Sequence, residues 1–189
     1  MDIVDHLGGA FASTGRFVAT LTPDRLRAPT PCPEWDVRAL LNHATGVVAN
    51  FGAAASRTAP GAKAETEPDF VGTDPSAQFE QAAAATLAAW GQPGALEGTC
   101  VLRGGFELPA QVAARINFLD TLVHGWDLAR ALNVDPTLDP ALATAALEVA
   151  KQIVTDDRRG PGKGFGPALA APAGASPTDA LVAFLGRRP

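Results

Sequence analysis

A chain of 189 residues, of which 47% are hydrophobic, is long enough to bury a sizeable core, and we predict a single domain over residues 1–189. Its charged residues are interspersed and sum to a net charge of -5, which argues against nucleic acid or an anionic membrane as a partner. The acidic N-terminus, and the lack of an apolar run of about 20 residues, predict a cytoplasmic protein without a signal peptide or membrane span.

Two amphipathic helices are predicted in the first third of the chain. Apolar residues recur at helical intervals between Asp2 and about Leu21, and Asp2 is suited to cap the first turn. A second apolar stripe follows Asp36, another suitable cap, and this helix carries His43 at the edge of the stripe. The proline-rich segment 29–33 cannot continue a helix, because proline lacks the amide proton, so we predict a rigid connection there.

The middle of the chain is predicted to contain a loop, a third helix and a small hairpin. Residues 58–73 show no periodicity and are typical of a loop. Asp74 and Pro75 then form a helix start, and Gly91 marks the end of that helix. Residues 100–105 combine a short apolar run with two glycines, a pattern that favours a two-stranded hairpin.

Three more helices are predicted toward the C-terminus. The longest covers about residues 109–132, and Asn133 can supply a left-handed stop. A fifth helix is predicted to begin near Pro140. A glycine-rich loop follows at 157–164, but its glycines are spaced too irregularly for a phosphate-binding loop. Residues 176–179 have the spacing of a capping box before a short sixth helix. The chain as a whole is predicted to be all-α.

The longest predicted helix carries a polar stripe. Asn117, Asp120, His124 and Asp127 follow one another at intervals of three, four and three residues. At about 100° per residue these positions lie within roughly 80° of the helix circumference. Apolar residues border the stripe on both sides, so the polar side chains are expected to be partly buried and to need a partner.

One partner that fits this stripe is a divalent metal ion. Asp120 and His124 are one helical turn apart and can point at the same ion, and a histidine from another helix would complete three ligands. His43 is the candidate, because His6 lies in a first turn, where chain ends fray. The alternative is that His43 and His124 are partly buried histidines hydrogen-bonded to Asp120, Asp127 or the backbone.

The two cysteines, Cys32 and Cys100, lack the close spacing of a metal-binding pair. In a reducing compartment we expect buried free thiols rather than a disulfide, with a reactive thiol as the alternative.

Two segments resemble those of a known family. The segment Thr30–His43 and the segment Asp120–Ala131 are similar to the two hallmark segments of the maleylpyruvate isomerase N-terminal domain group, within the DinB-like superfamily. Residues 175–189 also resemble the end of small single-domain members of that group. The resemblance extends over nearly the whole chain.

The resemblance implies a DinB-like four-helix bundle with short additional helices and a divalent metal held by His43, Asp120 and His124. The family pattern has glutamate where this chain has the shorter Asp120, so the resemblance does not fix the identity of the metal. Zinc is expected, with nickel or another divalent ion as alternatives. It further implies that Trp126 and Asp127 support the site, whereas Trp35 is expected to anchor the core. Side-chain packing and a salt bridge to Arg130 or Arg38 are the alternative roles for Trp126 and Asp127.

The function implied is that of a metal-dependent enzyme that uses mycothiol or a similar low-molecular-weight thiol. It would transfer the thiol to a small-molecule electrophile or isomerise that electrophile, as a monomer or homodimer. The alternative is a metal-binding or small-molecule-binding protein without catalysis, in which the metal is structural. A structural site tends to have no open coordination position. The sequence leaves a fourth ligand open among Asn117, Cys32, Glu34 and Asp127.

Overall fold

The computed structural model describes residues 1–58 and 68–189, so most of the predicted loop at 58–73 lies outside the described residues. The chain divides into two compact units, Met1–Asp135 and Pro136–Pro189, which we describe separately. The prediction of one domain stays a prediction.

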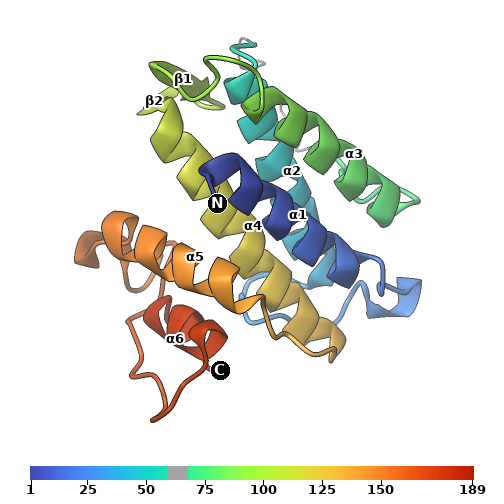
Figure 1. The fold of residues 1–189 in the computed structure, drawn as a ribbon. Helices are drawn as coiled ribbons and strands as arrows, with labels where there is room; N and C mark the ends of the chain where they lie inside the picture. Colours follow the sequence, from blue (N-terminus) through green and yellow to red (C-terminus); the bar gives the residue numbers. More distant parts are fainter. Residues whose placement is uncertain (59–67) are drawn as a thin grey trace. The chain divides into compact units, whose positions relative to one another are not determined.

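The first unit is a bundle of four helices with one hairpin (Figure 1). Helix α1 packs on α4 and α3, and α2 packs on α3 and α4, so the four helices enclose a common core. The largest wholly buried side chains of this unit include Trp90, Phe79 and Phe118. Its elements are α1 (Ile3–Val18), the 3-10 helix η1 (Pro23–Arg25), α2 (Val37–Ala55), α3 (Pro75–Trp90), β1 (Thr99–Leu102), β2 (Phe106–Pro109) and α4 (Ala110–Leu132).

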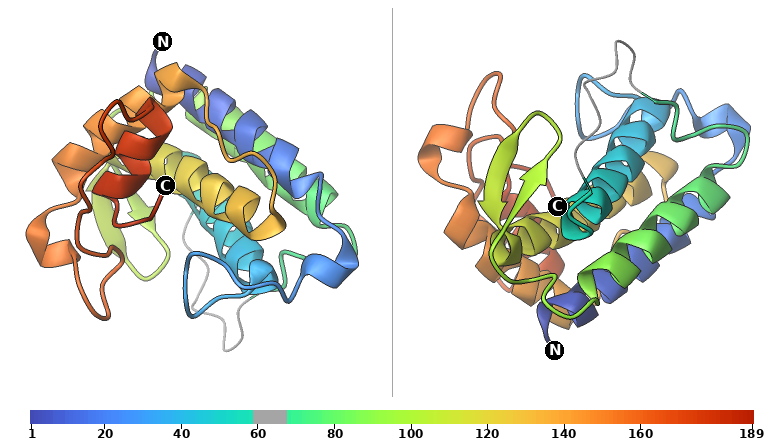
Figure 2. Two further views of the ribbon diagram at one scale, coloured as in Figure 1. Left: turned by 90° about the horizontal axis from the view of Figure 1, so that it is seen from below. Right: turned by 90° about the horizontal axis from the view of Figure 1, so that it is seen from above.

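The predicted hairpin is confirmed. Strands β1 and β2 pair antiparallel, with Cys100 opposite Leu108, and β2 leads directly into α4 (Figure 2). A two-stranded ribbon is marginal alone. Here β1 packs against α2, and Asn50 of that helix accepts a hydrogen bond from the amide of Arg103 at 2.9 Å.

The second unit contains α5 (Pro140–Ile153), the 3-10 helix η2 (Asp156–Arg158) and α6 (Pro177–Phe184). Helix α5 packs on α6, and the amide of Leu138 donates to the hydroxyl of Thr178 at 3.2 Å. The guanidinium of Arg159 lies over the ring of Phe184 and donates to its carbonyl oxygen at 2.8 Å. These contacts hold the short helix α6 in place.

Helix boundaries follow from local capping. Among the described residues, five of the six α-helices begin after a side chain that accepts hydrogen bonds from amides of the first turn, as such caps do in general. These capping residues are Asp2, Asp36, Asp74, Asp139 and Ser176. Helix α4 follows Pro109 without a side-chain cap and ends at Asn133 in the left-handed conformation, at φ 57°. The predicted helix starts and the predicted left-handed stop are therefore confirmed.

Candidate metal centre

Two neighbouring helices bring the predicted ligands together. Helix α2 carries His43, and α4 carries Asp120 and His124 on successive turns of one face. Because α2 packs on α4 in the bundle, the three side chains point into the same space. One ligand atom from each lies within 4.8 Å of one from each of the others.

The rings of His43 and His124 meet edge to face, with centroids 5.1 Å apart and an interplanar angle of 86°. The Nε2 atom of His124 lies 3.6 Å from Oδ1 of Asp120. Bonds of about 2.0–2.2 Å to a tetrahedral zinc ion would separate two such ligand atoms by about 3.3 Å, close to the distance present here.

The environment of Asp120 fits a cation. Its Oδ2 atom is buried and has no hydrogen-bond partner among the described residues. A buried carboxylate oxygen without a donor is costly, and a divalent ion bound between Asp120 and the two histidines would remove that cost. Two imidazoles and one carboxylate are also a donor set that zinc accepts, with a coordination position left over. The residues present therefore suit the predicted metal.

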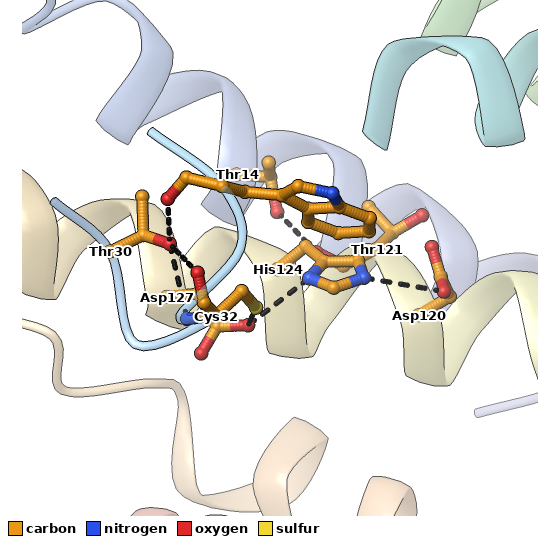
Figure 3. Close-up of polar contacts among 8 residues, drawn as sticks. Thr14, Thr30, Cys32, Asp120, Thr121, His124 and Asp127 are labelled. Carbon is orange, nitrogen blue, oxygen red and sulfur yellow. Dashed lines mark hydrogen bonds and ion pairs between the residues drawn. The ribbon is translucent and has the colours of Figure 1, made fainter. Parts of the chain in front are cut away.

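A second carboxylate fixes the imidazole of His124. Figure 3 shows the ring between Asp120 and Asp127, with Cys32 on the Asp127 side. Nδ1 of His124 lies 3.1 Å from Oδ2 of Asp127, whose side chain is fully buried. A proton on Nδ1 leaves Nε2, the atom that faces Asp120, free to act as a ligand.

These neighbours change the acidity of His124. Burial lowers the pKa of the imidazolium, but Asp120 and the hydrogen bonds to Asp127 and Cys32 outweigh it and raise the pKa to about 10. Without a metal, the site therefore holds a proton on His124 at neutral pH. A metal ion that binds Nε2 has to displace that proton.

The proline-rich connection before α2 forms one wall of the site. The indole of Trp35 lies 4.5 Å from the ring of His43 and 6.0 Å from that of His124, measured between centroids. Trp35 is half-buried and contacts both histidines. Its expected role as a core anchor did not include this contact. Trp35 lies eight residues before His43, in the connection that precedes α2, so the path of this connection, which no helical spacing predicts, decides the contact.

The structure distinguishes the two residues expected to support the site. Asp127 contacts His124, as the resemblance implies. Trp126 is 2% exposed and packs in the core, with the guanidinium of Arg130 5.4 Å from its ring centroid. Arg38, the other suggested ion-pair partner of Asp127, pairs with Asp69 at 2.8 Å.

The remaining candidates have different surroundings. Asn117 is wholly buried and accepts a hydrogen bond from Thr121 at 3.4 Å. Glu34 is exposed, and His6 stacks on Phe118 with ring centroids 5.2 Å apart. Among the described residues, neither Glu34 nor His6 belongs to a cluster of His, Cys, Asp or Glu side chains that could hold a metal.

Both cysteines are free, as expected. Cys100 is 1% exposed, and burial raises the pKa of its thiol. Cys32 is only half-buried, so the expectation of two buried thiols is wrong for this residue. It forms a second potential metal-binding group with His124 and Asp127.

Comparisons with known proteins agree with this architecture. The family model for the mycothiol maleylpyruvate isomerase N-terminal domain matches residues 7–129. Two Mycobacterium tuberculosis proteins, MT0763 and Rv0738, are each 37% identical over 179 residues, which cover 94% of this chain and 92% of theirs. Both are named as uncharacterised proteins, so they carry no information on activity.

A solved structure has the same fold. It is a mutant of the mycothiol-dependent maleylpyruvate isomerase, which aligns with a TM-score of 0.58 over 88% of this chain and 75% of its own. The sequences are 14% identical, so the likeness concerns the fold alone.

Proposed function

This chain belongs to the mycothiol maleylpyruvate isomerase N-terminal domain family, and we propose that it is a metal-dependent enzyme that uses a low-molecular-weight thiol such as mycothiol. Its second substrate would be a small-molecule electrophile, to which the thiol is transferred or which the thiol isomerises. The solved relative is described as mycothiol-dependent, which supports a thiol of this class.

The observation that carries the proposal is the convergence of His43, Asp120 and His124 from two helices, where one oxygen of Asp120 has no partner among the described residues. These three side chains would hold one divalent ion, zinc in the first instance. When bound, such an ion supplies a Lewis acid that lowers the pKa of a coordinated thiol.

The protein's own groups would position the reactants. The side chain of His124 is 12% exposed and that of Asp120 is 25% exposed, so the cluster can be reached from solvent. The half-buried indole of Trp35 beside both histidines would give an electrophile a flat apolar surface.

The test is the turnover of thiol and electrophile by metal-free and zinc-loaded protein. Each form is incubated with mycothiol, or with a simpler thiol, and a panel of small electrophiles. The remaining thiol is titrated and the remaining electrophile is quantified by chromatography, because isomerisation returns the thiol. We expect faster consumption only with zinc-loaded wild type, and a loss of that rate in Asp120→Asn. If zinc binds but no electrophile or thiol is consumed faster, the metal is structural and the enzyme proposal is wrong.

A further inference from the structure

Cys32 is held in place by the connection that carries it. Its amide donates to the hydroxyl of Thr30 at 3.1 Å, and its carbonyl oxygen accepts from that hydroxyl at 2.9 Å and from the amide of Trp35 at 2.9 Å. The thiol therefore projects from a backbone that is fixed on both sides. The same turn positions Trp35 against His43.

The thiol reaches the carboxylate that orients His124. Sγ of Cys32 donates to Oδ2 of Asp127 at 3.5 Å, and the same oxygen lies 3.1 Å from Nδ1 of His124. One buried carboxylate oxygen thus accepts two hydrogen bonds, one from the connection and one from its own helix. Two donors at fixed positions restrict the rotation of the Asp127 side chain more than one does.

We propose that Cys32 is a positioning residue that acts through Asp127 to hold His124 with Nε2 directed at the metal site. This inference rests on the proposed function for the identity of that site. Without the thiol, Oδ2 of Asp127 loses a hydrogen-bond donor inside the protein, where an unmet hydrogen bond is costly. The carboxylate would then gain freedom to turn, and with it the imidazole that it holds.

A direct ligand role for Cys32 is the competing interpretation. Cys32 shares a cluster with His124 and Asp127, on the Nδ1 side of the imidazole, whereas His43 and Asp120 form a separate cluster with His124. The Asp127 oxygen already accepts from both Nδ1 and the thiol. The geometry therefore favours a hydrogen-bonding role for the thiol.

The experiment compares zinc affinity, by chelator competition, in Cys32→Ala and Cys32→Ser, with Cys100→Ala as the matched control at the other free cysteine. Loss of an outer hydrogen-bond partner typically weakens metal binding by about 10–100-fold. We expect Cys32→Ala to weaken zinc binding at least about tenfold and Cys32→Ser, which keeps a donor, to recover most of that loss. Cys100→Ala should bind zinc as the wild type does.

A double-mutant cycle separates positioning from general damage to the fold. Because Cys32 acts through Asp127, Cys32→Ala should add little to the effect of Asp127→Asn. Additive losses of affinity, or equal losses in Cys32→Ala and Cys100→Ala, would overturn the proposal. So would a sulfur-to-metal charge-transfer band that cobalt-loaded protein shows without added thiol and that Cys32→Ser lacks, because Cys32 would then be a ligand.

A measurement without metal keeps this inference distinct from the proposed function. The nitrogen and proton NMR signals of the His124 ring in metal-free protein report which nitrogen carries the hydrogen bond. We expect Cys32→Ala, but not Cys100→Ala, to shift the Nδ1 signals. Unchanged NMR signals of the His124 ring in Cys32→Ala would contradict the positioning role even if zinc binds. Shifted ring signals in a protein that binds no metal would refute only the metal site.

Discussion

His124 takes part in two sets of contacts at once. Its Nε2 atom faces Asp120 in the cluster with His43, while Nδ1 lies against the buried Asp127. A metal-binding histidine generally needs such a second contact to fix its tautomer and ring orientation.

We expect about one divalent ion per chain in wild-type protein, by elemental analysis after purification without an affinity tag. His124→Ala and His43→Ala should each lose most of it, because each removes one of two nitrogen ligands. His6→Ala is the control, since His6 stacks on Phe118 outside the cluster. Folded His43→Ala and His124→Ala proteins that both keep the wild-type content would refute the site.

Metal affinity should also depend on pH. The pKa of His124 is raised to about 10 in the metal-free protein, so the imidazole is protonated throughout the neutral range. Because the ion has to displace this proton, affinity should increase as pH rises, by up to about tenfold per pH unit between pH 6 and 8. Isothermal titration in buffers of different ionisation heat would show the released proton. A pH-independent affinity would contradict the assignment of His124 as a ligand.

Close contact between helices shapes the site at the level of secondary structure. The hydroxyl of Thr14 in α1 donates to the carbonyl oxygen of Thr121 in α4 at 2.9 Å. Gly125, next to His124, faces Thr14 so closely that a Cβ atom there would overlap its hydroxyl. A glycine at this point lets α1 approach the segment of α4 that carries the ligands.

Gly125→Ala should therefore destabilise the protein by about 1–3 kcal/mol, the usual cost of overpacking, measured by urea unfolding. Gly8→Ala in α1 is the control, because its new methyl group would make an ordinary contact with Leu87 at 3.6 Å. That change should stabilise the helix by about 0.5–1 kcal/mol. Equal effects of the two substitutions would show that the approach of α1 to α4 at Gly125 is not tight.

For the helices, the sequence could predict the features that depend on residues close together in the chain. Caps such as Asp36 and the stop at Asn133 depend on a few neighbouring residues, and so does the spacing of Asp120 and His124 on one helix face. The contacts of Trp35 and Cys32 depend on the path of a proline-rich connection across two helices, which no periodicity encodes. The bundle came from the family resemblance, which also supported His43, the candidate that the residues alone left as one of two interpretations.

For the whole molecule, the described residues include no helix that is long and apolar enough to cross a membrane. The prediction that nucleic acid is not a partner is based on the net charge of -5 and stays a prediction. Monomer or homodimer, and a cytoplasmic location, also remain predictions.

Metal binding should stabilise the folded chain as a whole. Zinc at about 100 times its Kd adds about 2.7 kcal/mol to the free energy of unfolding, provided that it binds only the folded state. For a chain of 189 residues this corresponds to a rise in Tm of about 5–11 °C. Calorimetry of zinc-loaded wild type and His124→Ala should show the rise in the former alone. An equal rise in both would place the bound zinc elsewhere.

In the proposed metal site, three protein ligands hold the ion and leave one coordination position open for a thiol. Cobalt-substituted protein can reveal such a position, because a thiolate bound to cobalt gives a sulfur-to-metal charge-transfer absorption. Adding mycothiol, or a simpler thiol, to wild type should produce this band, and His124→Ala should not show it. A cobalt spectrum of the wild type that stays unchanged over a wide range of thiol concentration would contradict the proposed open position.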